Sequence, residues 1–325
     1  MPTDTRTRPR IPSIDQFRGF SILLMVLANY LAGIETVPAY MKHSEDIGLT
    51  VADLIAPLFI LAIGLSYRQS ALRRKAQSGT VKMIGHFLKR FLIFCGIGVI
   101  LSSGEEIFGF SDTIYSWGVL QTIGCTGLIV LPFIFFGTLY RFIIGAAFLA
   151  VYQLFLNTHL LHFVLGSSHG GIIGTMSWAA LLLFATVFAD IFYRKNPRKY
   201  FFVFISIAAI AAALLLSKWL PISKNRVSAS YVLISLGTGG LLFSLFHLFA
   251  DICKRRLGLL SWWGQNPIVL YLLHFILLAV FVFPKGPGWY IEASAVVIIM
   301  ESIFILSAIS ATAYCLYRRK IIISV

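Results

Sequence analysis

A histidine and an aspartate ten residues apart are the pair in this chain best suited to acid–base chemistry. His43 lies in the polar segment 40–48, and Asp53 follows it inside an apolar run. Histidine can act as a base or a nucleophile because its unperturbed side chain titrates near neutral pH. An ionisable residue inside an apolar run is costly to bury and is a functional candidate. We therefore expect Asp53 to orient the imidazole of His43, as in a catalytic triad; a helix cap or an ion pair is the alternative.

Two asparagines and a second histidine lie at the ends or in the middle of other apolar runs. Asn29 comes near the end of the first run, where its amide can hold an oxyanion or simply bond a neighbouring helix. Asn266 precedes Pro267, as at the start of a helix. Tyr271 and His274 are three residues apart and share a helix face. A pocket role and plain interhelical hydrogen bonding both stay open for this stretch.

The remaining histidines and the cysteines do not predict a metal site or a disulfide. His159, His162 and His169 cluster after the fifth apolar run, but no carboxylate lies near them to complete a metal site. The four cysteines are far apart and form no C-x-x-C pair. We expect no metal, and cysteines that serve as small packing residues.

The composition indicates which elements must position these residues. The chain has 325 residues, of which 58% are hydrophobic and only 12% charged, about half the usual charged fraction of a soluble domain. This excludes a cytosolic enzyme, a disordered chain and a secreted disulfide scaffold. We expect an all-α integral membrane protein, one domain over 1–325 with a short cytoplasmic tail at 1–13. A bundle of about ten membrane-spanning helices is predicted, at 15–33, 50–68, 84–102, 116–136, 141–157, 171–193, 199–219, 229–251, 266–284 and 291–317.

The basic residues predict the orientation. With the N-terminus in the cytoplasm, 22 of the 27 lysines and arginines fall in cytoplasmic segments, as the positive-inside rule requires. Both termini are then cytoplasmic and His43 lies outside. The net charge of +14 is explained without nucleic acid. The apolar run from Phe17 has no small-residue cleavage site, which suits an uncleaved protein of a prokaryotic cytoplasmic membrane.

The N-terminal stretch has both a structural and a family-specific interpretation. Ser13 and Gln16 have capping-box spacing, and Asp15 and Arg18 suit a helix start at a membrane edge. With further residues, this stretch resembles the heparan-α-glucosaminide N-acetyltransferase family. The matching residues are Ser13, Asp15, Phe17, Arg18, Gly19, Asn29, Tyr30, Lys42, His43, Gly48, Leu49, Thr50, Val51, Ala52, Asp53, Leu54, Pro57, Phe59, Gly64, Ser66, Gly118, Val119, Leu120, Gln121, Ile123, Gly124, Asn266, Tyr271 and His274.

The resemblance implies a transmembrane acetyltransferase that uses cytosolic acetyl-CoA and an acceptor, an amino sugar or other glycan, on the outer side. The family's catalytic histidine falls on His43 and its essential asparagine on Asn29. Since phosphate binding needs Lys or Arg, we expect the segments 68–90 and 194–199 to bind the nucleotide. The expected acetyl-CoA site comprises Arg18, Arg73, Arg74, Lys89, Arg90, Gln121, Asn266 and His274. A homodimer stays open.

One departure from the family and two rival functions bear on this interpretation. The family's Asp-Pro-Glu-Gly motif has no acidic counterpart at 167–175 here, so the acceptor can differ. Surface-polysaccharide O-acyltransferases share the span count and a similar N-terminal stretch, but usually carry histidine where this chain has Asn29. A transporter of a lipid-linked sugar would instead use Asp53 and His274 as a proton relay.

Overall fold

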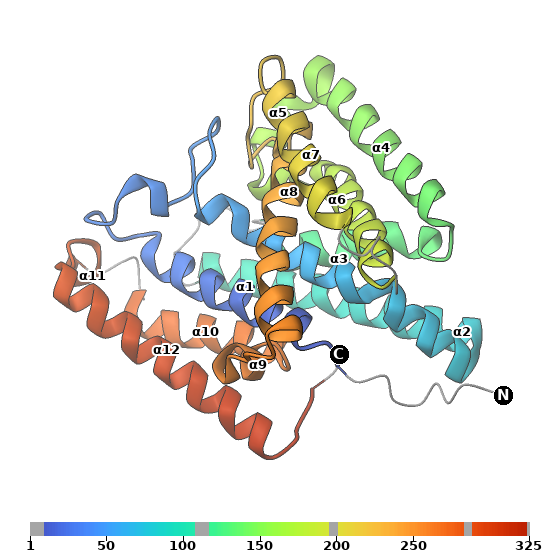
Figure 1. Cartoon of the computed structure of the whole chain (residues 1–325). Coiled ribbons are helices and arrows are strands. Elements are labelled where there is room, and N and C mark those ends of the chain that lie inside the picture. The colour runs from blue at the N-terminus through green and yellow to red at the C-terminus, as the bar shows by residue number, and fades with distance from the viewer. Residues whose placement is uncertain (1–9, 108–116, 195–200, 283–287, 324–325) are drawn as a thin grey trace.

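The computed structural model describes residues 10–107, 117–194, 201–282 and 288–323. Within these ranges the chain is helical and contains no β-strand. Figure 1 shows the helices α1 Pro12–Leu31, α2 Ile55–Ile107, α3 Val119–Val130, α4 Thr138–Phe155, α5 Leu161–Leu165, α6 Gly171–Phe192, α7 Phe201–Leu216, α8 Ala229–Phe246, α9 Gly258–Trp263, α10 Pro267–Val282, α11 Gly288–Ile291 and α12 Ala295–Arg318.

Each of the expected apolar runs is largely helical in the described residues. Five helical segments are long and apolar enough to cross a membrane: Ala52–Ser103, Thr138–Leu165, Ser168–Phe192, Ala229–Ile252 and Ala295–Arg318. Three shorter apolar helices accompany them: Val119–Phe133, Phe201–Leu216 and Pro267–Val280. Helices satisfy their own backbone hydrogen bonds, which is the requirement for a segment in lipid. The protein is therefore an all-α integral membrane protein, while the number of spans and their orientation stay predictions.

α2 differs from the sequence expectation because it joins two predicted spans. The segment 68–83, expected as a loop, is helical on both sides of Gly79, which has φ 83° and breaks the helix. This segment is rich in Arg, Lys, Gln and Ala, which favour helix. Glycine adopts the positive φ without a Cβ clash, so the direction of the chain changes within one residue.

The start of α1 also differs from the expectation. Ile11 provides no side-chain cap, and Ser13 lies inside the first turn. Ser13 donates to the Asp251 carboxylate from its N–H at 3.2 Å and from Oγ at 2.5 Å, and Gln16 donates to Ser261 at 3.3 Å. The predicted capping box is therefore wrong. A carboxylate from the turn after α8 satisfies an unpaired N–H of the first helical turn instead.

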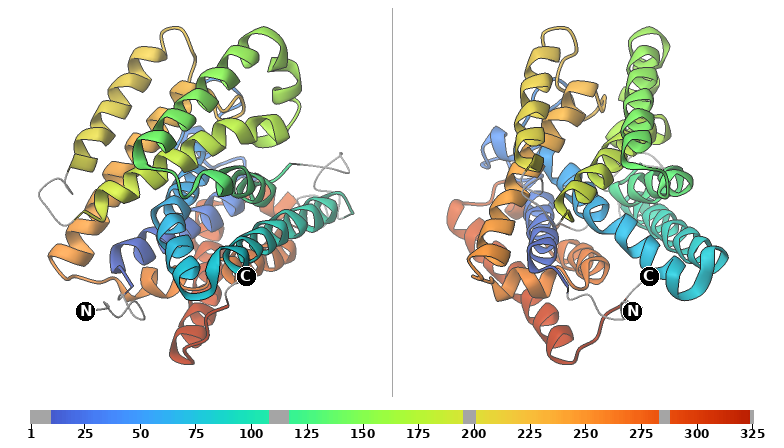
Figure 2. Two further views of the ribbon diagram at one scale, coloured as in Figure 1. Left: turned by 90° about the vertical axis from the view of Figure 1, so that its right-hand side faces the viewer. Right: turned by 45° about the vertical axis from the view of Figure 1, so that its right-hand side comes forward.

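α6 is the centre of the bundle, and α12 lies at its edge. α6 packs against α2, α3, α4 and α8, whereas α12 contacts α9, α10 and α1 (Figure 1). Figure 2 shows α7 alongside α8, where Gly237 permits close approach: a Cβ there would lie 2.6 Å from the Ser206 carbonyl oxygen. In lipid, such packing contacts rather than the hydrophobic effect hold helices together, which favours small residues at their crossings.

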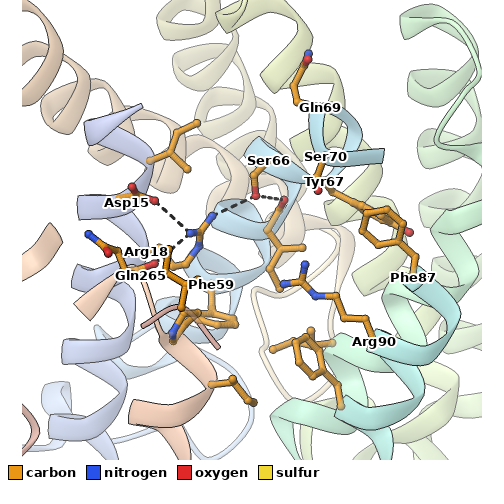
Figure 3. A pocket seen from close by; sticks show the side chains of 18 of the residues that line it. Asp15, Arg18, Phe59, Ser66, Tyr67, Gln69, Ser70, Phe87, Arg90 and Gln265 are labelled. Atoms are coloured by element: carbon orange, nitrogen blue, oxygen red, sulfur yellow. Dashed lines mark hydrogen bonds and ion pairs between the residues drawn. The ribbon is translucent and has the colours of Figure 1, made fainter. Parts of the chain in front are cut away.

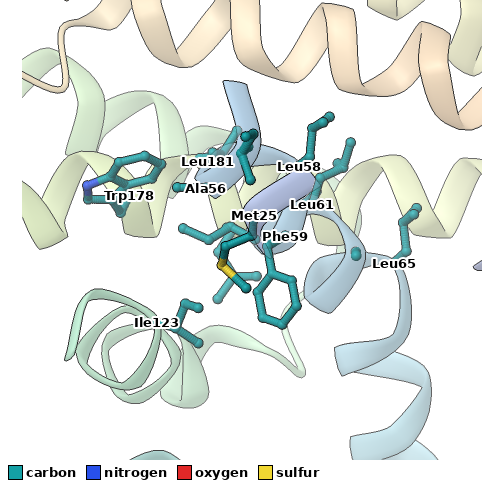
Figure 4. Close-up of a cluster of buried hydrophobic side chains, with 14 of the residues drawn as sticks. Met25, Ala56, Leu58, Phe59, Leu61, Leu65, Ile123, Trp178 and Leu181 are labelled. Carbon is teal, nitrogen blue, oxygen red and sulfur yellow. The ribbon is translucent and has the colours of Figure 1, made fainter. Parts of the chain in front are cut away.

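A cluster of large apolar side chains lies between α1, α2, α3 and α6. Met25, Phe59, Ile123 and Trp178 belong to this cluster, and each is almost fully buried (Figure 4). This cluster packs the second half of α1 and the start of α2 against α6. It thereby positions the two segments that carry the candidate catalytic residues.

Candidate active site

His43 and Asp53 form the hydrogen-bonded pair expected of a base and its orienting carboxylate. His43 Nδ1 lies 3.0 Å from Asp53 Oδ1. The Asp53 side chain has no exposed surface, whereas the His43 side chain is 42% exposed. Asp53 Oδ2 accepts bonds from Ser44 Oγ at 2.8 Å and from the Thr50 N–H and Oγ1 at 3.1 and 3.0 Å. These bonds hold the carboxylate ionised and fixed, so His43 Nε2 is left to meet a substrate.

The backbone around Asp53 explains why it is held so firmly. Thr50 Oγ1 accepts the Asp53 N–H at 3.3 Å, and the Asp53 carboxylate accepts the Thr50 N–H in return. This reciprocal arrangement is a capping box at the start of the turn that leads into α2. The Asp53 carbonyl oxygen also accepts the Tyr231 hydroxyl at 2.6 Å. Asp53 therefore caps a helix and contacts the imidazole at once, so both alternatives from the sequence apply.

Asn29 and His274 form a second polar pair, between α1 and α10. Asn29 Nδ2 lies 2.9 Å from His274 Nε2, and His274 Nδ1 bonds the Tyr271 carbonyl oxygen. The amide can donate to Nε2 only when the histidine proton is on Nδ1, so the two bonds define one neutral tautomer. His274 is fully buried, and its ring contacts the Tyr271 ring with centroids 4.9 Å apart. α1 also packs against the Ala52–Leu54 turn, which contains Asp53.

A cavity of about 510 Å³ opens among α1, α2, α3 and the α9–α10 region. Its lining includes four of the predicted acetyl-CoA ligands: Arg18, Arg73, Arg74 and Arg90. Figure 3 shows Arg18 and Arg90 on facing sides, with Phe59 on the wall. Apolar lining residues come from the core cluster and from α10, namely Met25, Phe59, Ile123 and Tyr271. The cavity thus combines a cationic part with an apolar part.

The two arginines in Figure 3 have different surroundings. Arg18 is held by Asp15 at 3.4 Å, the Gly264 carbonyl at 3.2 Å and Ser66 Oγ at 3.2 Å. Among the residues the structure describes, Arg90 Nε is buried without a hydrogen-bond partner. Buried polar groups are nearly always bonded, so this guanidinium N–H is available to a water molecule or a ligand in the cavity.

Four of the predicted cofactor ligands do not line this cavity. Lys89 lies on a separate shallow, apolar surface depression. Gln121 caps α3 by accepting the Gly118 N–H at 3.0 Å. Asn266 bonds the segment that follows α12. Its amide donates to the Ile321 carbonyl at 2.9 Å and accepts from the Ile323 N–H at 2.8 Å. His274 bonds Asn29 instead. Of the expected phosphate-binding segment 194–199, residues 195–199 lie outside the described ranges.

Asp190 is an ionisable residue that the sequence reasoning missed. It accepts from Arg68 NH1 at 3.1 Å, from Thr138 Oγ1 at 2.8 Å and from the fully buried Arg141. The rule that drew attention to Asp53, a carboxylate inside an apolar run, applies equally to Asp190. The network joins α2, α4 and α6, and it explains why these two arginines are absent from the cavity lining.

Two more residues near the His43–Asp53 pair were not singled out as site residues. Lys224, in the loop between α7 and α8, is 7% exposed. Burial lowers the pKa of its ammonium to about 8, and the nearby Asp53 carboxylate partly offsets this effect. His169 is 9% exposed and lies within electrostatic range of His43, Asp53 and Lys224. No local sequence signal joins these residues, because they come from three distant segments.

Comparison with known proteins places the chain in a family. The model of the heparan-alpha-glucosaminide N-acetyltransferase catalytic region matches residues 10–215. The chain belongs to this family. The mouse heparan-alpha-glucosaminide N-acetyltransferase is 38% identical over 133 residues, which are 39% of this chain and 19% of the mouse protein. The human protein of the same name is 37% identical over 128 residues, 38% of this chain and 18% of that protein. The chain thus matches about a fifth of the length of these relatives.

Family membership confirms the resemblance found in the sequence. The matched region contains Asn29, His43, Asp53 and the four cavity arginines, but His274 and Lys224 lie beyond it. The site is therefore built partly by residues that the family match does not cover. Within the described ranges, no group of three or more His, Cys, Asp or Glu side chains is arranged to hold a metal ion.

Proposed function

We propose that the protein is a transmembrane acetyltransferase. It binds acetyl-CoA in the arginine-lined cavity and transfers the acetyl group to an amine or hydroxyl group of a sugar. The transfer takes place at His43. The observation that carries the proposal is the position of this cavity. Its cationic part is formed by α1 and α2, and its apolar lining includes Met25, one helical turn before Asn29, and Tyr271, whose ring contacts that of His274. Membership of an acetyltransferase family supports the same chemistry.

The cavity has the properties needed to hold the donor. About 510 Å³ lies within the usual range for small-molecule sites, about 300–1,000 Å³. Guanidinium groups bind phosphate through paired N–H donors, and Arg73, Arg74 and Arg90 lie where the nucleotide phosphates would enter. The apolar lining suits the pantetheine arm.

The deep end of the cavity lies close to the candidate catalytic residues. Met25 precedes Asn29 on α1 by four residues, about 6 Å along the helix axis. Phe59 follows Asp53 by six residues, about 9 Å. A thioester at this end would reach Asn29, whose amide has two N–H donors. One bonds His274, and the other can stabilise the oxyanion that forms on the thioester carbonyl.

His43 then completes the transfer. With Nδ1 bonded to Asp53, Nε2 can take the proton of the acceptor as the acceptor attacks the thioester carbonyl. Alternatively Nε2 attacks first, forms an acetyl-imidazole and passes the acetyl group on. Both routes break the same C–S bond, and the thiolate of CoA leaves and is protonated. The exposed imidazole is open to an acceptor from the aqueous side.

The topology proposed with this function is about ten spans with both termini cytoplasmic, in a prokaryotic cytoplasmic membrane. In support, the arginines that charge bias assigns to the cytoplasm line one cavity. Asp53 and Arg73 are twenty residues apart on α2 and its leading turn, about 30 Å at helical rise, the thickness of a bilayer core. Donor and acceptor would thus meet from opposite sides; a homodimer stays open.

The test uses the purified protein in sealed vesicles, with acetyl-CoA supplied from one side and glucosamine or a glycan acceptor from the other. We expect CoA thiol release that depends on the acceptor, and acetylated product on the acceptor side only. Movement of a sugar across the vesicle wall without consumption of acetyl-CoA would overturn the proposal in favour of a transporter.

A further inference from the structure

The loop that carries Lys224 is fastened to the segment that carries His43. Arg226 Nε binds Asp46 at 2.9 and 3.0 Å, and Ser223 Oγ donates to the same carboxylate at 2.9 Å. The pairing with Arg226 lowers the pKa of Asp46, so this ion pair persists at neutral pH. The Gly48 N–H also donates to the Ile222 carbonyl at 2.8 Å. The loop is therefore fixed beside the candidate catalytic pair.

Lys224 is largely buried in this fixed loop. The residue is 7% exposed, and no hydrogen bond or ion pair to its ammonium is found among the residues that the structure describes. Its Nζ is not among the fully buried nitrogen atoms without a partner, so the remaining exposed surface includes the ammonium. A charge that keeps so little contact with water is stabilised when an anionic group binds it.

His169 presents a second unsatisfied group in the same place. Its Nδ1 is buried and has no hydrogen-bond partner among the described residues. Its backbone has φ 55°, and Val227 in the facing loop has φ 47°. Positive φ is unusual for histidine and strained for a β-branched residue, and such strain collects at binding and catalytic sites.

These two residues lie within electrostatic range of the candidate catalytic pair. The charges of Lys224, His43 and Asp53 all act on His169. A chain of contacts links His169 to Asp53: the Trp178 indole N–H donates to the His169 carbonyl at 3.0 Å, and its ring packs on that of Tyr231. The Tyr231 hydroxyl in turn bonds the Asp53 carbonyl.

We propose that Lys224 and His169 form a binding subsite for an anionic oxygen group of the acceptor, a carboxylate or a phosphate, beside the position where the acetyl group is transferred. This inference rests on the proposed function, because it takes the bound molecule to be the acetyl acceptor. Lys224 supplies the charge, and His169 supplies a further hydrogen-bond donor when its proton is on Nδ1. The acceptor is thus an acidic sugar or a sugar phosphate. A cationic amine placed there would meet like charge.

The first experiment measures binding alone. Glucuronate, glucose 6-phosphate and neutral glucose are titrated calorimetrically against the detergent-purified wild type, Lys224→Met and Lys218→Met. Lys218 is an exposed lysine of the same loop and serves as the matched control. We expect at least one anionic sugar to bind tighter than glucose, and Lys224→Met to lose about 10- to 100-fold of that affinity. The two anions distinguish carboxylate from phosphate.

The second experiment measures acetyl transfer to the same sugars. We expect Lys224→Met to lower the ratio of kcat/KM for anionic over neutral acceptor by about 10- to 100-fold, chiefly through KM. His169→Asn, which tolerates the positive φ, should lower the ratio less. Lys224→Arg and Lys218→Met should both keep the wild-type ratio of kcat/KM for anionic over neutral acceptor. Each variant's melting temperature is measured, and Lys224→Met should melt no lower than the wild type.

The outcomes separate the two proposals. Equal binding and equal transfer of anionic and neutral sugars would overturn the subsite and leave the acetyltransferase intact. Equal losses for both sugars in Lys224→Met would assign the residue a general structural or catalytic role and also overturn the subsite. Binding of an anionic sugar that depends on Lys224, without any transfer from acetyl-CoA, would retain the subsite and reject the proposed function.

Discussion

The molecule has two cationic sites, and they differ in residue type, in packing and in number of charges. The cavity is open and is lined by Arg18, Arg73, Arg74 and Arg90. The proposed site beside His43 is largely buried and contains one lysine and one histidine. Arginine stays charged and binds phosphate through two parallel donors, whereas buried lysine changes its charge with pH. Under the proposals made above, the first site would bind a polyphosphate and the second a single anionic group.

The two sites also share a feature: each has a buried side-chain nitrogen without a partner in the described chain, Arg90 Nε in one and His169 Nδ1 in the other. The first segment of α2 connects them, with Asp53 just before its start and Arg73 and Arg74 beyond its middle. A stiff helix keeps donor and acceptor at a fixed separation. Under the proposed function, the chemistry would occur between them, at Asn29, His43 and Asp53.

The largest effect on activity should come from a change at Asp53, which lies between the two sites and orients the imidazole of His43. Asp53→Asn keeps the shape but removes the charge that stabilises the protonated ring. We expect kcat to fall about 10²–10⁴-fold with acetyl-CoA affinity retained. Initial rates of CoA thiol release measure this. Glu45→Gln, an exposed carboxylate of the same segment, is the control and should lose little; a kcat for Asp53→Asn equal to that of this control would contradict the role.

Removal of the candidate oxyanion donor should have the next largest effect. Asn29→Ala takes away the amide bonded to His274 Nε2 at 2.9 Å. Loss of one such donor typically costs about 10²–10³-fold in kcat. Asn157→Ala, which removes an amide bonded to Gln153, should keep wild-type kcat. If Asn29→Ala raises KM for acetyl-CoA but leaves kcat intact, Asn29 binds the donor rather than the oxyanion.

Two adjacent residues of α2, Lys89 and Arg90, test whether the cavity itself binds acetyl-CoA. Arg90→Met should weaken acetyl-CoA binding about 10- to 100-fold, because a charged hydrogen-bond donor to phosphate is lost. Lys89→Met should have no effect, since Lys89 faces away from the cavity lining. Titration calorimetry of both variants provides the measurement. Equal losses for both would mean that net charge, and not the cavity, attracts the nucleotide.

The smallest effect should be the pH dependence of the second site. The pKa of Lys224 is lowered to about 8, so its charge is complete well below pH 8 and is lost as the pH rises through 8. The preference in kcat/KM for an anionic acceptor should fall about tenfold between pH 7 and 9.5. Lys224→Arg should keep its preference throughout, because guanidinium does not titrate in this range. A wild-type preference that is independent of pH would exclude Lys224 as the source of the charge.

Local patterns predicted the His43–Asp53 contact and most of the helices. Ten residues separate this pair, so the contact depends on one short segment and one helix start. The apolar runs are long, and helix is the stable form of such runs in lipid. Four of the eight residues predicted to bind acetyl-CoA line one cavity, and all four are arginines. They were selected because phosphate binding needs basic side chains, and their binding role stays a prediction.

Other features depend on contacts that no local pattern encodes. Lys89 and Arg90 are neighbours in sequence, but successive residues point about 100° apart on a helix, and only the packing of α2 against α3 decides which one faces the cavity. Lys224 and His169 come within electrostatic range of Asp53 only because three distant segments converge. Asn29 finds its partner on α10, outside the region of family similarity.

The most direct test of the central claim compares the wild type with His43→Ala in detergent, measuring acetyl-CoA binding and acetyl transfer separately. The account predicts that both proteins bind acetyl-CoA with similar affinity, while transfer by His43→Ala falls about 10²–10⁴-fold. Undiminished transfer by His43→Ala would contradict the assignment of His43. Absence of acetyl-CoA binding by the wild type would contradict the donor site and with it the proposed function.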